Sequence, residues 1–175
     1  MLSASASKLP HNVNWGARQS VVRPSCEEDQ TTQDPFNLGR FVEAQNRSGG
    51  YARALEELQH GRKYSHWIWW IFPQFAGLGI SSMSREYSIH SLEEARAYLN
   101  HPVLGPRLRE VTEIMIGHAG TKASAILASD DVKFRSCMTL FMRAAPDEQL
   151  FRKAIDLFFH AAPDPMTDRL LTTDS

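Results

Sequence analysis

Polar side chains alternate with aromatic rings between residues 61 and 74, where the chain reads GRKYSHWIWWIFPQ. Three of the four tryptophans of the chain fall in this stretch. An indole ring can stack on the ring of a ligand, a histidine can transfer a proton near neutral pH, and lysine, serine and glutamine side chains can contact an anion or an amide edge. The sequence therefore predicts one pocket, lined by Lys63, Ser65, His66, Trp67 and Gln74.

A glycine-containing segment, FAGLGISS, follows directly. Gly77 and Gly79 are two residues apart, and Ser81 precedes an expected short helix. Such a loop can turn backbone amides toward an anion at a helix N-terminus. The pattern is neither a Walker loop nor a dinucleotide-binding fingerprint, so a plain turn is the alternative. We expect Gly77, Gly79 and Ser81 to contribute phosphate contacts.

Each of these residues also has a structural interpretation. The three neighbouring tryptophans cannot all face one way, so Trp69 or Trp70 is expected in the core and Trp67 is the better stacking residue. His66 is equally compatible with a structural role. Gln45, on an apolar helix face, would most often be a hydrogen-bonded buried amide, but its amide can also contact the edge of a ligand, and we expect it to line the pocket with Glu43. Lys133 shares a face with Ser136 and Thr139, which is either solvated or the wall of a polar pocket.

Short helices are expected to position these groups. Asp34-Pro35, Ser91 to Glu94, Asp130, Asp147 and Asp164-Pro165 have the residue types of helix starts, and Gly61 suits a helix end. Leu104, Leu108, Val111 and Met115 form an apolar stripe at helical spacing. The only segment that fits a strand is 67–72. We predict a mainly α fold: a disordered extension over residues 1–33, one compact multi-helix domain over 34–171, and a tail over 172–175.

Composition excludes several classes of protein. The chain of 175 residues is 42% hydrophobic and 22% charged, with a net charge of −1 and no basic block, so nucleic acid is not an expected partner. No apolar run is long enough to cross a bilayer, so no membrane partner is expected. Cys26 and Cys137 lack the spacing of a metal site, and we expect reduced thiols, no metal and no cofactor. A cytoplasmic location is expected, with a mitochondrial one as the alternative, because no acid precedes Glu27 in a basic, serine-containing leader.

Seven motifs are spread along the chain: FVEAQ (41–45), GRKYSHW (61–67), IFPQ (71–74), GLG (77–79), EARAYL (94–99), HPVLG (101–105) and SCMTLF (136–141). Together they resemble the uncharacterised family known as domain of unknown function 1810. The resemblance covers about residues 34–171, and it implies a compact, mainly helical domain without an established activity. Nothing in the chain is similar to the repeated inhibitory segments of calpastatin, a label sometimes given to members.

The segment 41–45 also resembles, more distantly, the helix motif of NADAR/YbiA-like proteins. That likeness implies ADP-ribose or related nucleotide-type metabolites as ligands, cleavage of an N-glycosidic bond, and Glu43 as the general acid or base.

Two functions follow as expectations. The first is binding or processing of a small nucleotide-like metabolite, with Glu43 or His66 moving a proton. The second is a protein interaction module that uses exposed aromatic side chains of WIWWIFP. Oligomeric state is not predicted.

Overall fold

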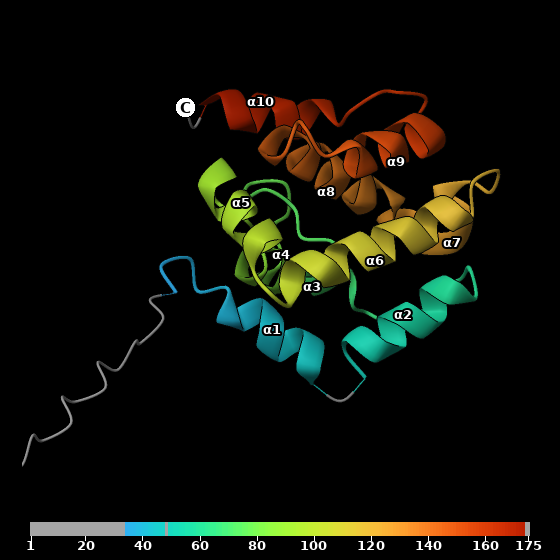
Figure 1. Ribbon diagram of the computed structural model, residues 1–175, viewed down its shortest axis with the longest axis horizontal. Coiled ribbons are helices and arrows are strands. Elements are labelled where there is room, and N and C mark those ends of the chain that lie inside the picture. Colours follow the sequence, from blue (N-terminus) through green and yellow to red (C-terminus); the bar gives the residue numbers. More distant parts are fainter. Residues whose placement is uncertain (1–33, 48, 174–175) are drawn as a thin grey trace, which may run out of the picture. The chain divides into compact units, whose positions relative to one another are not determined.

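A computed structural model describes residues 34–47 and 49–173, and these residues form a helical body (Figure 1). The predicted mainly α fold is confirmed. Among the described residues there is no strand, and one isolated parallel bridge joins Phe75 to Ile89. The extension predicted over residues 1–33 lies outside the described part of the chain, so its disorder stays a prediction.

The helices are short and follow one another closely along the chain. They are α1 (Gly39–Asn46), α2 (Tyr51–Gln59), α3 (Ile68–Ile71), α4 (Ser82–Glu86), α5 (Leu92–Asn100), α6 (Leu104–Gly117), α7 (Ala123–Leu127), η1 (Ala128–Asp130), α8 (Asp131–Ala144), α9 (Gln149–Phe159) and α10 (Pro165–Thr173).

Helix α8 is the centre of the core. It packs against α5, α9 and α10, while α6 packs against α5, α9 and α2 (Figure 1). Phe134, Cys137 and Phe141 on α8 are fully buried. The predicted apolar stripe of α6 is buried along its whole length, from Leu104 to Met115. A core of this size supplies the main stabilisation of a domain.

Several predicted helix boundaries are confirmed by hydrogen bonds. The Ser91 hydroxyl accepts from the Glu94 amide at 3.0 Å at the start of α5. The Asp164 carboxylate accepts from the Thr167 amide at 2.9 Å at the start of α10. Gly61 follows α2 with a φ of +67°, a conformation that favours glycine. Asp34 accepts from the amides of Leu38 and Gly39, so it caps α1 from further upstream than a usual N-cap residue.

Other local features differ from what the sequence suggested. Residues 68–71 form a helical turn instead of a strand, because Trp67, Ile68, Ile71 and Phe72 recur at helical spacing and all face the core. Asp130 makes no capping bond and instead binds two lysines. The start of α9 has no side-chain cap either. Helix α10 runs through Thr173, two residues into the predicted tail.

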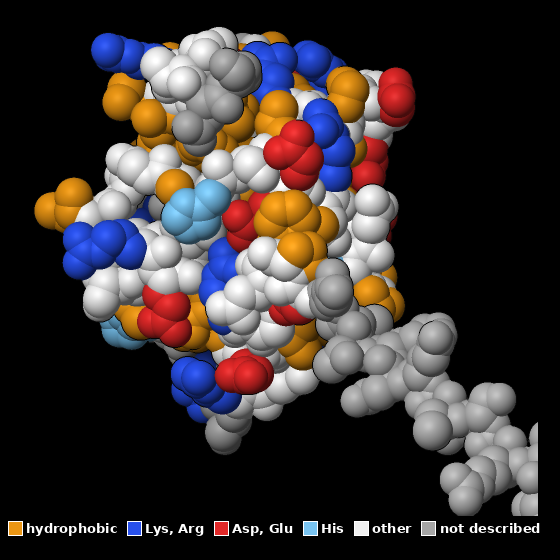
Figure 2. Space-filling model, turned by 90° about the vertical axis from the view of Figure 1, so that its left-hand side faces the viewer, with side chains coloured by type: hydrophobic (Ala, Val, Ile, Leu, Met, Phe, Trp, Pro, Cys, Tyr) orange, Lys and Arg blue, Asp and Glu red, His pale blue; other side chains and the backbone are white. Residues whose placement is uncertain are grey.

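The surface in Figure 2 shows no extended area of one charge. Basic and acidic side chains are interspersed on that face, and hydrophobic side chains occur in small separate groups. None of the helices in the described residues is long and apolar enough to cross a membrane.

Candidate functional site

A buried carboxylate holds the segment that precedes α3. Glu57 lies on α2 and is 8% exposed. It accepts hydrogen bonds from the amides of Tyr64 at 2.7 Å and Ser65 at 3.0 Å, from Trp67 Nε1 at 2.8 Å, and from the Ser65 hydroxyl through a very short bond. One carboxylate therefore fixes three residues of the segment 64–67.

Hydrogen bonds stabilise the charge on Glu57, which forms no salt bridge with any residue that the structure describes. Burial alone would raise the pKa of this carboxyl group, but the hydrogen bonds from Ser65, Tyr64 and Trp67 outweigh burial and lower the pKa to about 2. Glu57 is therefore ionised at every physiological pH, and four neutral donors satisfy it.

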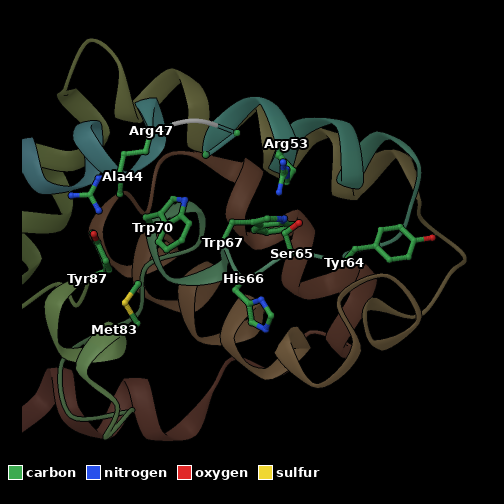
Figure 3. A pocket seen from close by; sticks show the side chains of 12 residues that line it. Ala44, Arg47, Arg53, Tyr64, Ser65, His66, Trp67, Trp70, Met83 and Tyr87 are labelled. Carbon is green, nitrogen blue, oxygen red and sulfur yellow. The ribbon is translucent and has the colours of Figure 1, made fainter.

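The side of this segment that faces α1 and α4 borders a cavity of about 520 Å³, shown in Figure 3. We call it the aromatic cavity. Its lining residues come from the end of α1, the start of α2, the segment 64–70 and the region of α4. They are Ala44, Arg47, Gly49, Gly50, Arg53, Tyr64, Ser65, His66, Trp67, Trp70, Met83 and Tyr87.

Two arginines lie on either side of Trp70 in this cavity. Figure 3 shows Arg47 reaching from the end of α1 toward Tyr87, and Arg53 reaching from α2 toward Trp67 and Ser65. The side chains of both are exposed and make no hydrogen bond or ion pair with a described residue. No carboxylate occurs among the described lining residues. The charged residues of the lining are therefore cationic. Burial raises the pKa of the Tyr87 hydroxyl group most, and two acids outside the lining, Glu86 and Glu43, lie near enough to raise it further.

The burial of Trp67 and Trp70 differs from the expectation that Trp67 would be the stacking residue. Trp67 is 1% exposed and its Nε1 is bound to Glu57, so it forms the floor of the cavity. Trp70 is half-buried, packs edge-on against Tyr87 at 5.6 Å between ring centroids, and is the indole with more surface available to a ligand. Trp70 Nε1 is a buried donor that lacks a partner among the described residues, which is uncommon in folded proteins.

Only some of the predicted site residues meet in the aromatic cavity. Ser65, His66 and Trp67 line it, with His66 exposed at its edge. A second cavity of about 360 Å³ is lined by four of the other eight: Gln74, Gly79, Ser81 and Lys133. Helix α4 contributes Met83 to the first cavity and Ser84 to the second. The second cavity is lined by Trp69, Gln74, Leu78, Gly79, Ile80, Ser81, Ser84, Val132 and Lys133. The structure thus separates the predicted single pocket into two.

The two predicted anion-binding lysines share one acid. Lys63 Nζ lies 2.7 Å and Lys133 Nζ 2.6 Å from opposite oxygens of Asp130. Burial would raise the pKa of Asp130, but the hydrogen bonds from Lys133 and Lys63 lower it. The Lys63 amide also donates to the Ile126 carbonyl at 2.8 Å. Both lysines therefore have structural partners, and Lys63 lines neither cavity.

The remaining predicted residues lie elsewhere. The Gln45 side-chain amide donates to the Trp70 carbonyl at 2.8 Å and to the Tyr98 hydroxyl at 3.2 Å, and accepts from Arg107, so it is a satisfied buried amide. Glu43 is exposed on α1 and outside the lining of the aromatic cavity. Gly77 has a φ of +91° and lines neither cavity, so it serves the turn.

The chemistry open to the aromatic cavity is ring contact, anion binding and proton exchange through His66. In the described part of the chain, no cluster of three or more histidine, cysteine or acidic side chains could hold a metal ion. Cys137 is a free, fully buried thiol, and burial raises its pKa.

Sequence reasoning missed the residues that give the cavity its charge. Arg47 and Arg53 flank a glycine pair in NRSGGYAR, a signal that two helices meet closely there. A Cβ on Gly50 would lie 2.4 Å from the Ala44 carbonyl oxygen, so only glycine permits this approach. Glu57 also carried a signal, because Ala54 and Leu58 place it on the buried face of α2.

Comparison with known proteins supports the family resemblance. A crystal structure of the conserved hypothetical protein Rv1873 from Mycobacterium tuberculosis is 44% identical, with a TM-score of 0.76, and the match covers 79% of this chain and 99% of that one. No curated protein matches the chain. The profile of the family described as protein of unknown function (DUF1810) matches residues 35–171. The chain belongs to the DUF1810 family.

Proposed function

We propose that the protein binds the ring of a small nucleotide-like metabolite in the aromatic cavity. The observation that carries this proposal is the combination, in one cavity, of an indole face on Trp70 with unpaired arginines and no lining carboxylate among the described residues. Its volume of about 520 Å³ falls in the range of small-molecule sites, roughly 300 to 1,000 Å³.

The proposal concerns binding. Cleavage of an N-glycosidic bond needs a general acid or base within reach of the bond, and Glu43 lies outside the described lining. His66 is the imidazole at the cavity edge. Hydrolysis would therefore have to use His66 or a group outside the lining.

The alternative, an interaction module built on WIWWIFP, has less support. Trp67, Ile68, Ile71, Phe72 and Pro73 are buried, and Trp69 and Trp70 are half-buried. The stretch therefore offers no broad exposed aromatic patch of the kind that forms the centre of a protein interface.

A thermal-shift screen against ADP-ribose, NAD, AMP, GMP and FMN tests the proposal. A ligand at a hundredfold its dissociation constant stabilises the folded state by about 2.7 kcal/mol, so the melting temperature should rise. Trp70→Leu should reduce the shift, because it removes the ring that faces the cavity. Trp69→Leu is the matched control, because Trp69 lies on the same helical turn but lines the other cavity.

Two results would contradict the proposal. One is a screen in which no nucleotide-type compound raises the melting temperature. The other is a shift that Trp69→Leu and Trp70→Leu reduce equally, since that would place the ligand outside the aromatic cavity.

A further inference from the structure

We infer that the aromatic cavity selects a phosphate ester, held by Arg47 and Arg53. This inference rests on the proposed function and specifies the charged group of the ligand. Figure 3 shows the two guanidinium groups on opposite sides of Trp70, so that a ring placed on Trp70 has a cation at either end.

The pairing of the arginines in this fold supports the inference. Arg109 and Arg143 each form a two-bond contact with a carboxylate, and Arg40 combines a carboxylate with backbone carbonyls. Arg47 and Arg53 line a cavity, and their guanidinium groups have no such partner in the described residues. Glu43 and Glu86 act electrostatically on Tyr87 beside Arg47, but neither lines the cavity or forms an ion pair with the two arginines. Two cations in the lining without an ion-pair partner in the described residues can bind an anionic ligand.

The nearest buried acid does not neutralise them. Glu57 is turned toward Tyr64, Ser65 and Trp67, whose donors already occupy its two oxygens. It stands behind the wall of the cavity and is not among the residues that line it. A cavity with such a charge balance favours an anion over a neutral ligand.

The charge balance further favours phosphate over carboxylate. A phosphomonoester carries a charge of about −1.5 to −2 near pH 7 and three acceptor oxygens. It can therefore form a two-bond contact with the guanidinium group on its side of Trp70, and its remaining charge attracts the guanidinium group on the other side. A carboxylate carries a single charge, which one guanidinium group neutralises. Helix dipoles do not decide the matter, because the negative end of α1 and the positive end of α2 meet at the same place.

Gly49 positions one of these two guanidinium groups. A Cβ on Gly49 would lie 3.1 Å from Arg53 Nε and 3.3 Å from Arg53 Nη2, and Gly49 has a φ of +77°. The Arg53 side chain therefore folds closely over Gly49 at the start of α2 while remaining exposed to solvent. This position reduces the side-chain ordering that anion binding requires.

Calorimetric titration of the full chain with three matched probes tests the inference. The probes are adenosine, adenosine-5′-carboxylic acid and AMP, which share one ring and differ in charge. We expect AMP to bind at least about tenfold more tightly than adenosine, with the carboxylate between them. Arg47→Gln and Arg53→Gln should each weaken AMP binding by a larger factor than adenosine binding, so that most of the advantage of AMP is lost. Arg152→Gln, an exposed change on α9 outside the cavity, is the control.

The outcomes separate the inference from the proposed function. If adenosine binds as tightly as AMP, or if the advantage of AMP survives both substitutions, the phosphate inference is overturned while ring binding stands. If none of these probes binds, the proposal of ring binding fails for adenine compounds. Titration with pyrophosphate then tests whether Arg47 and Arg53 form an anion site without a ring. Binding of pyrophosphate that Arg53→Gln abolishes would support the anion site alone, and absence of pyrophosphate binding would overturn it.

Discussion

Replacing Glu57 by glutamine should destabilise the fold in a pH-dependent way. Three donors converge on Glu57 Oε2 and the Ser65 hydroxyl donates to Oε1. A glutamine can keep its oxygen on the side of the three donors and turn its amide toward Ser65, whose hydroxyl can accept as well as donate. Glu57→Gln therefore preserves the shape of the network and removes mainly its charge.

The size of the effect follows from the pKa of Glu57. A pKa lowered from 4.5 to about 2 corresponds to about 3 kcal/mol of stability at neutral pH. Because the folded-state pKa lies below the unfolded value, this contribution is complete well above pH 4.5 and is lost as the pH falls toward 2. Glu57→Gln should thus lower the free energy of unfolding by about 3 kcal/mol at pH 7 and by about half that amount at pH 3.

Urea denaturation of both proteins at pH 7, 5, 4 and 3 measures this difference. Glu56→Gln is the matched control, because the neighbouring side chain on α2 is exposed, and its effect should stay within about 0.5 kcal/mol. A difference between wild type and Glu57→Gln that is equal at pH 7 and pH 3 would refute the assignment of the stabilisation to the carboxylate charge. A difference below about 1 kcal/mol at pH 7 would refute its magnitude.

Three further outcomes follow from single positions. Trp67→Phe should lower the free energy of unfolding by about 1 to 3 kcal/mol more than Trp70→Phe in urea denaturation. The two changes remove the same atoms, but among the described residues Trp67 Nε1 has a hydrogen-bond partner and Trp70 Nε1 has none; equal losses would contradict this. Gly50→Ala should lower the melting temperature, since its Cβ would meet a carbonyl oxygen at 2.4 Å. Gly117→Ala has open space at the end of α6 and should raise the free energy of unfolding by about 0.5 to 1 kcal/mol. Cys137 is fully buried, and burial raises its pKa, so in a variant without the other cysteine it should react with a thiol reagent only as fast as the protein unfolds; rapid labelling of the native protein would contradict its burial.

Much of the helical framework could be predicted because its signals are local. The cap at Ser91, the turn at Asp164 and the stripe of α6 each depend on residues within a few positions of one another. The segment 67–72 was ambiguous because it lacks such a local signal. A run of large apolar residues that is buried on most sides carries no clear period, and only its packing decides between a turn of helix and a strand.

The candidate site depended on long-range geometry that no local spacing encodes. Sequence placed Lys63 beside the aromatic residues but could not show that Asp130, far along the chain, would bind it. It also could not show that the ends of α1 and α2 would bring Arg47 and Arg53 to the same tryptophans. Neighbours in sequence such as Trp69 and Trp70 line different cavities, because successive residues of a helical turn face different directions.

The anchoring of the segment 63–67 has a consequence for the speed of recognition. This segment is tied to α2 through Glu57 and to the region before α8 through Ile126 and Asp130. A wall held at three places exists before any ligand arrives, so binding does not have to wait for a loop to fold. Association should then occur in a single kinetic phase whose observed rate rises linearly with ligand concentration, without the plateau that a slow conformational step imposes.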